Sequence, residues 1–497
     1  MRSRLSTYFG GLRGGRAGEA AWVGVSKGVS MCLSLFIAMA LSRLMAPTAY
    51  GTYLQILYVY NTLLVLFSLG LPSCYSYFLA RVGREEGRSV VTKLTVMCAV
   101  MGCVFSLALY LSADHIALLL GNEELGRGLR LFSVVPLAMM PVAGVEGVLI
   151  ACKRAGWLAV YVCLSRLVTL MCVVGAAWVC DGDPMAVTVA FSAASVASAV
   201  VGLWLSYRPF RGVEPVGSSL TYGDFLRFAL PVFYAGIYGF VISSSSQFFV
   251  SRYFGAGDFA VFSNGFREMP LAVIVTSAVG SVLLPELSRL AVTSGAECVG
   301  VWRRALYKSV SVVWPVAVFC IVFAPEIMVT LFGEGYRCGA TLFRLASMIC
   351  FVLVVPFFPL MAALGRSRDF ARAHLLTAVS IVVLDCLSVR VFPSMTVIAA
   401  VSVAARMTCL VALLLTVSRV TGVGVSRLLP LRDMMRVLAV SGVACGSAVG
   451  VTSLTGIDGA PLTLAVAVGV AASVYVAVAC RSGLTLWPLL RGNLSGN

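Results

Sequence analysis

The sequence predicts an all-α integral membrane protein with fourteen transmembrane helices. Of its 497 residues, 60% are hydrophobic and only 12% are charged, whereas soluble domains carry about 25% charged residues. The apolar residues form fourteen runs, each long enough to cross a hydrocarbon core of roughly 30 Å as a helix. Basic residues concentrate in every second loop between these runs, as expected of a chain that crosses a membrane repeatedly.

Glycine, proline, serine or charged residues separate the apolar runs. The first seven runs cover residues 22–45, 51–71, 93–113, 128–151, 157–179, 184–206 and 225–250. The second seven cover residues 259–284, 306–332, 339–363, 373–391, 395–417, 434–454 and 461–479. No separator is long enough to form a soluble domain. The first run is too long for the apolar core of a signal peptide, so we expect an uncleaved first helix.

The distribution of the 37 lysine and arginine residues predicts the orientation. Most of them lie in both chain ends and in the loops near residues 81–93, 153–154, 208–227, 289–308, 366–372 and 419–436. With fourteen spans, all of these segments lie on one side. Because basic loops remain cytoplasmic, we expect a multi-pass protein of the cell inner membrane with both termini in the cytoplasm.

The chain also contains an internal repeat. The segment SRLMAPTAYGTY from Ser42 resembles SRYFGAGDFAVF from Ser251, and ADHIALLLGNEE from Ala113 resembles APEIMVTLFGEG from Ala324. The two offsets are nearly equal, and the matches include polar residues, which chance similarity between apolar segments does not explain. An offset of six helices preserves direction through the membrane. We therefore expect two parallel six-helix bundles, 1–212 and 213–422, followed by two additional helices in 423–497.

Several of these segments resemble a known family. The first-to-second helix junction LSRLMAPTAYGTY, FLRFALPVFYAG from Phe225 and APEIMVTLFGEGYRCGATLFRLAS from Ala324 are similar to polysaccharide transporters. These form the O-antigen flippase branch of the multidrug/oligosaccharidyl-lipid/polysaccharide (MOP) exporter superfamily. The resemblance implies a fourteen-helix transporter that flips an undecaprenyl-diphosphate-linked glycan to the periplasmic face by alternating access. One departure is the seventh helix, where the family often carries an Asp and this chain has Ser243–Ser246 and Gln247.

Ionisable residues inside apolar runs are costly and therefore indicate function or structural pairing. An anionic diphosphate headgroup favours arginine, which binds phosphate through two hydrogen bonds. We expect Asn264, Arg267 and Glu268 to form a polar stripe on one helix, because residues three or four apart share a face. The expected substrate-binding residues are Arg267, Lys27, Arg166, Arg406, Asn264 and Gln247.

Three buried acids are candidates for ion coupling. A carboxyl group in an apolar environment can carry a proton, and an ionised one can bind sodium. The candidates are Asp385, Glu268 and Glu146, with Asp385 deepest in its run. No metal site or other cofactor is expected, because most of the 16 cysteines lie in apolar runs, CxxC pairs are absent and the chain has only two histidines.

Three other functions compete with glycan flipping. A lipid II flippase is the nearest alternative. A cation-coupled multidrug exporter is expected to carry an acid in the first run, and residues 22–45 contain none. A glycan polymerase or ligase normally needs a long outer loop, so we do not expect an enzyme. The expected partners are a lipid-linked oligosaccharide, membrane lipids and other polysaccharide-assembly proteins. The net charge of +16 does not indicate a nucleic-acid partner, because most of the basic residues lie in loops next to the membrane.

Overall fold

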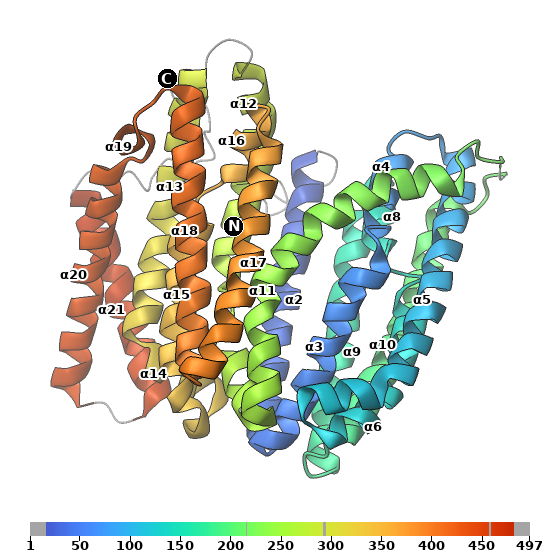
Figure 1. Ribbon diagram of the computed structural model, residues 1–497, viewed down its shortest axis with the longest axis horizontal. Coiled ribbons are helices and arrows are strands. Elements are labelled where there is room, and N and C mark those ends of the chain that lie inside the picture. The colour runs from blue at the N-terminus through green and yellow to red at the C-terminus, as the bar shows by residue number, and fades with distance from the viewer. Residues whose placement is uncertain (1–15, 215, 292–294, 457–458, 482–497) are drawn as a thin grey trace, which may run out of the picture. The chain divides into compact units, whose positions relative to one another are not determined.

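The computed structural model describes residues 16–214, 216–291, 295–456 and 459–481. Every regular element in these ranges is a helix (Figure 1), which confirms the expected all-α fold. The chain forms two compact units. Unit 1 comprises Met1–Phe240 with Ser251–Ala260, and unit 2 comprises Val241–Val250 with Val261–Asn497. The expected boundaries at 1–212, 213–422 and 423–497 stay a prediction.

Unit 1 is built from α2 to α10, the short helix η1 and parts of α11. Its helices are α2 (Arg16–Leu44), α3 (Pro47–Ser68), α4 (Pro72–Leu79), α5 (Arg84–Leu120), α6 (Glu123–Phe132), α7 (Val134–Met139), α8 (Val145–Ala151), α9 (Ala155–Val179), α10 (Pro184–Tyr207), η1 (Arg208–Phe210) and α11 (Tyr222–Gly265). Helix α9 packs between α2 and α10. Leu71, Tyr75 and Leu94 lie in a buried core between α4 and α5, and close packing of such side chains favours helix association in a bilayer.

Unit 2 is built from the other parts of α11 and from the helices that follow it. They are α12 (Pro270–Leu290), α13 (Gly295–Val322), α14 (Ala324–Phe332), η2 (Glu334–Gly339), α15 (Ala340–Leu353), α16 (Phe357–Ala363), α17 (Ser367–Val391), α18 (Met395–Thr421), α19 (Val425–Leu428), α20 (Leu431–Thr455) and α21 (Ala460–Arg481). Helices α17 and α18 lie side by side, as do α20 and α21 (Figure 1). The core surrounds Trp302, whose ring N–H donates to the Pro356 carbonyl at 3.0 Å.

The described residues contain 11 helices long and apolar enough to span a membrane, or up to 13 if each of two bent pairs is one span. The expected run 128–151 is not among them, because it is divided among α6, α7 and α8. Pro136 and Pro141 lack the N–H groups that a continuous helix needs. At the start of α8, a Cβ on Gly144 would lie 2.2 Å from the Tyr75 ring, so this break allows α4 and α8 to pack closely.

The expected run 259–284 is also interrupted, and here the prediction was wrong. Helix α11 ends at Gly265, α12 begins at Pro270, and Arg267 to Met269 are not helical. A proline disfavours helical geometry in the residue before it, and Met269 is extended, with φ −72° and ψ 120°. Arg267 and Glu268 therefore do not continue a helical stripe from Asn264.

The first repeat landmark has a structural counterpart within unit 1. Ala46 precedes α3, and the position 209 residues later is Gly255, where α11 kinks with φ 85° and ψ 173°. The two copies pack against each other. A Cβ on Gly51 would lie 1.8 Å from the Ala256 carbonyl oxygen, so only glycine allows this approach.

Candidate functional site

Arg406 is the centre of a charged cluster in unit 2. Its position on α18 is 8% exposed. Nη1 donates to Glu268 Oε1 at 2.7 Å, and Nη2 donates to the Ile242 carbonyl at 3.3 Å. The arginine thus joins α18 to α11 and to the linker before α12. A charge so poorly exposed to solvent requires such a partner, because unpaired burial is costly.

Asp385 lies one helix away, on α17, and is fully buried. Its Oδ2 accepts hydrogen bonds from Ser246 at 3.0 Å and from Ser245 at 3.3 Å. Its other oxygen, Oδ1, has no hydrogen-bond partner among the described residues. These serines belong to the segment of α11 in which the resembling family often carries an Asp. A carboxyl group from α17 therefore lies beside the segment that lacks one.

The surroundings of Asp385 are apolar. Ile242, Ala378, Ile381 and Ala405 form a small buried cluster on the same helices. The neighbouring hydroxyl of Ser388 donates to a carbonyl of its own helix, Leu384 O. Two serine hydroxyls alone stabilise an ionised carboxylate poorly in such an environment, so a bound proton or cation would complete its interactions.

A second polar group lies in unit 1. The Lys27 ammonium on α2 is 3.1 Å from Glu146 Oε1 on α8, with side-chain exposures of 61% and 48%. One turn along α2, the Ser30 hydroxyl accepts a hydrogen bond from Arg166 Nε of α9 at 3.1 Å. This group is much more exposed than the cluster around Arg406, so its charges are open to further ligands.

The structure thus divides the sequence-predicted residues into two sets. Arg406, Glu268 and Asp385 belong to unit 2, whereas Lys27, Arg166 and Glu146 belong to unit 1. The remaining three candidates also belong to unit 2: Arg267 is exposed, Gln247 is half-buried and Asn264 is buried. A shared cavity lined by Arg267, Lys27 and Arg166 stays a prediction.

Sequence reasoning missed the partners of these charges. Nothing in the sequence singles out Ser245 and Ser246 from their serine-rich neighbours, or Ser30 from other helical serines. From the sequence, Arg84, Lys153 and Arg154 indicated only which loops are cytoplasmic. In the structure, these three residues line a pocket in unit 1. Among the residues that the structure describes, no group of three His, Cys, Asp or Glu residues is placed to hold a metal ion.

Comparison with known families identifies the chain. A model of the family described as polysaccharide biosynthesis protein matches residues 18–291, more than half of the sequence. The chain belongs to this polysaccharide biosynthesis family. Membership confirms the resemblance found in the sequence. No curated protein sequence matches the chain.

Solved structures of MOP transporters share the fold of this family member. A lipid II flippase, MurJ, in an inward closed conformation matches with a TM-score of 0.70 at 12% identity, covering 91% of this chain and 97% of that one. An inward-facing multidrug resistance MATE family transporter of the MOP superfamily gives 0.57 at 14% identity, covering 80% and 96%. A MOP superfamily transporter from Pyrococcus furiosus gives 0.54 at 14% identity, covering 82% and 97%. The protein is therefore a multi-pass membrane protein with a MOP transporter fold.

Proposed function

We propose that this protein flips a lipid-linked oligosaccharide, an undecaprenyl-diphosphate-linked glycan, from the cytoplasmic to the periplasmic face of the inner membrane. The observation that carries the proposal is the polysaccharide biosynthesis family match over residues 18–291 in a chain with a MOP transporter fold. The reaction is translocation by alternating access, with no covalent change to the glycan. Both termini lie in the cytoplasm, as the basic loops predict.

The diphosphate headgroup would be held by cations that are open to a ligand. Arg267 is exposed, and no described residue forms an ion pair with it. Arg166 donates through Nε to the Ser30 hydroxyl, and no described residue is seen to bond its two Nη groups, which can serve as further donors. Arg406 is engaged by Glu268, so it orients that carboxylate and does not serve as the first phosphate ligand.

Coupling to an ion would take place at Asp385. The buried carboxyl has two hydroxyl neighbours and one oxygen without a partner among the described residues. Protonation would neutralise the group, and a sodium ion would be coordinated by the carboxylate together with the serine oxygens. Glu268 and Glu146 are secondary candidates, because each already pairs with a cation.

Arg267→Ala provides the test. In cells that lack the endogenous gene, this variant should abolish transport of the lipid-linked glycan while its abundance in the membrane stays normal. Arg267→Lys should recover only part of the activity, because a point charge lacks the planar fork of arginine. Arg344→Ala is the matched control, since Arg344 is, like Arg267, an exposed arginine of unit 2, and its Nε donates to the Ile321 carbonyl. Full transport by a stably expressed Arg267→Ala protein would remove the residue from the mechanism.

A lipid II flippase is the second candidate, favoured by the TM-score of 0.70 with MurJ. The two substrates can be separated by complementation. Cells depleted of their lipid II flippase should not be rescued by this protein, whereas cells lacking a polysaccharide flippase should regain surface glycan. The multidrug alternative is weaker, because the spanning part of α2, Trp22–Leu44, contains no acid.

A further inference from the structure

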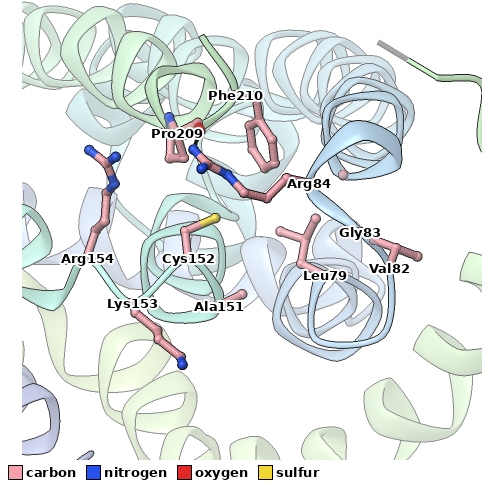
Figure 2. Close-up of a pocket in the computed structure, with 11 residues that line it drawn as sticks. Leu79, Val82, Gly83, Arg84, Ala151, Cys152, Lys153, Arg154, Pro209 and Phe210 are labelled. Atoms are coloured by element: carbon pink, nitrogen blue, oxygen red, sulfur yellow. Dashed lines mark hydrogen bonds between the residues drawn. The ribbon is translucent and has the colours of Figure 1, made fainter. Parts of the chain in front are cut away.

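A pocket of about 300 Å³ lies in unit 1, and its lining includes none of the residues of the polar groups described above. It is formed where α5 begins, where α8 turns into α9, and at η1. Figure 2 shows Cys152 in the α8–α9 turn, with Phe210 of η1 on another wall. The volume corresponds to about ten water molecules at ~30 Å³ each, enough for a phosphate group with part of its organic substituent.

The pocket is strongly basic. Arg84, Lys153 and Arg154 contribute to its lining, and among the described residues no acidic one does. In Figure 2, Arg84 extends across the pocket toward Pro209, and Arg154 points to the same end, whereas Lys153 points the other way. The Glu86 carboxylate on the first turn of α5 accepts a bond from the Ser218 hydroxyl at 2.6 Å and does not line the pocket.

Two helices begin at the pocket wall. The N-terminal residues of α5 and α9 are preceded by Gly83 and Arg154, and neither position caps its helix with a side-chain hydrogen bond. Uncapped N–H groups and the helix dipole both attract anions. The first turn of α5 contains Glu85 and Glu86, which offset its dipole, but the first turn of α9 contains no acid. Helix α9 therefore adds the larger positive potential.

The walls hold the Arg84 side chain and the backbone of Arg154 in place. A Cβ on Gly87 would lie 2.7 Å from the Phe210 ring, so α5 packs directly on η1. Arg84 Nη2 donates to the Pro209 carbonyl, and the guanidinium retains further donors for a ligand. Arg154 N donates to the Leu149 carbonyl at 2.8 Å, closing the end of α8. Arg84 is exposed and Arg154 half-buried, so both guanidinium groups can be reached by an anionic ligand.

We propose that this pocket binds a phosphate group, with Arg84 and Arg154 as its charged ligands and the N-terminus of α9 as a further donor. The phosphate could belong to an anionic lipid headgroup or to a soluble phosphate. Trp157 lies close to Arg154 in the sequence, and the Arg208 guanidinium is 3.8 Å from the centroid of its ring. Tryptophan is enriched at membrane–water interfaces, where lipid headgroups lie. This binding does not depend on which substrate the transporter flips.

Cys152 offers a direct reporter, because its thiol lines the pocket. Burial raises the pKa of this thiol, and the positive charges of Arg84 and Arg154 oppose part of that rise. Both guanidinium groups are thus close enough to influence the sulfur. A bound phosphate should shield the thiol and offset the arginine charges, and both effects slow its reaction with N-ethylmaleimide.

The experiment uses the full-length protein in phosphatidylcholine nanodiscs, with alkylation of Cys152 quantified by mass spectrometry. One arm adds inorganic phosphate against sodium chloride of equal ionic strength, and the other adds phosphatidylglycerol to the bilayer. Either ligand should slow alkylation at Cys152 severalfold while leaving the exposed Cys180 unchanged. Protection by phosphate identifies a soluble ligand, and protection by phosphatidylglycerol alone identifies a lipid headgroup.

Variants test the assigned ligands. Arg84→Gln and Arg154→Gln should each raise the half-protecting ligand concentration roughly fivefold, the value expected for one basic residue beside a phosphate. Arg211→Gln is the control, because Arg211 belongs to the same basic region but does not line the pocket. The proposal would be overturned if neither ligand protects Cys152 in the wild-type protein. It would also be overturned if a folded Arg84→Gln/Arg154→Gln protein is protected as strongly as the wild type. The wild-type arm keeps the proposal testable if the double variant does not fold.

Discussion

Removing the guanidinium of Arg406 should destabilise the protein by about 3 kcal/mol, the lower end of the range for breaking a buried ion pair. The Arg406 side chain is 9% exposed and the Glu268 side chain 33% exposed, with 2.7 Å between the paired atoms. In Arg406→Met, the methionine fills most of the space, but Glu268 loses its cation and the Ile242 carbonyl loses a donor. The partial exposure of Glu268 allows some solvation, which keeps the expected loss at the lower end of that range.

The double variant Arg406→Met/Glu268→Gln gives a sharper test of the same reasoning. It contains neither charge, so no ion remains without a counter-charge. Its stability should recover to within about 1–2 kcal/mol of the wild type, because an ion pair replaced at both positions costs far less than a broken one. The two single effects should therefore not add, because each single variant breaks the pair and only the double variant removes both charges.

The assay is unfolding of the purified protein in mixed micelles with increasing sodium dodecyl sulfate, followed by tryptophan fluorescence. Arg344→Met is the control, because Arg344 donates to a carbonyl at 3.1 Å and should cost only about 1 kcal/mol. The ion-pair reasoning fails if the Arg406 and Glu268 effects add, or if Arg406→Met is no more harmful than the control. A stable but transport-deficient double variant would place the pair in transport as well as in folding.

Three further predictions follow from other contacts. Gly51→Ala should prevent accumulation of folded protein, because its Cβ would lie 1.8 Å from the Ala256 carbonyl oxygen. The control Gly175→Ala, on an open face of α9, should be tolerated, and immunoblotting of membranes compares the abundance of the two variants. Asp385→Asn should remain folded but lose ion-coupled transport, since an amide retains hydrogen bonding but cannot titrate; unchanged coupling in transport assays would exclude this residue. Ser367→Cys in a cysteine-free background should react with a membrane-impermeant maleimide only after the cytoplasmic side is opened, and labelling of intact cells would contradict the predicted topology.

Hydropathy predicted most of the spans because an apolar helix has one stable environment, the bilayer, whatever its detailed packing. It did not predict where helices break. The run 128–151 is apolar enough to span, but Pro136, Pro141 and the close approach of Gly144 to Tyr75 divide it. Prolines are tolerated in transmembrane helices when neighbours satisfy the freed backbone groups. Their presence in the sequence therefore did not decide between a kink and a break.

The chemistry of the candidate sites was partly predictable from residue type. Asp385 and Arg406 stood out because charges in apolar runs need a reason, and both are buried. Their partners could not be predicted, since Ser246 and Glu268 lie 139 and 138 residues away in the chain. Glu268 was expected on a helix with Arg267, whereas the extended backbone before Pro270 removes both from any helix. Only the tertiary structure brings Glu268 to Arg406.

The placement of the ion pairs bears on the proposed mechanism. Lys27 pairs with Glu146 inside unit 1, and Arg406 pairs with Glu268 inside unit 2. Breaking a poorly exposed pair such as that of Arg406 would cost about 3–5 kcal/mol. Alternating access by rigid-body movement is inexpensive only if such pairs remain intact during the movement. Pairs contained within a unit meet this condition. In the proposed mechanism, Arg267, for which no described residue is an ion-pair partner, would be the cation that gains and loses the phosphate ligand.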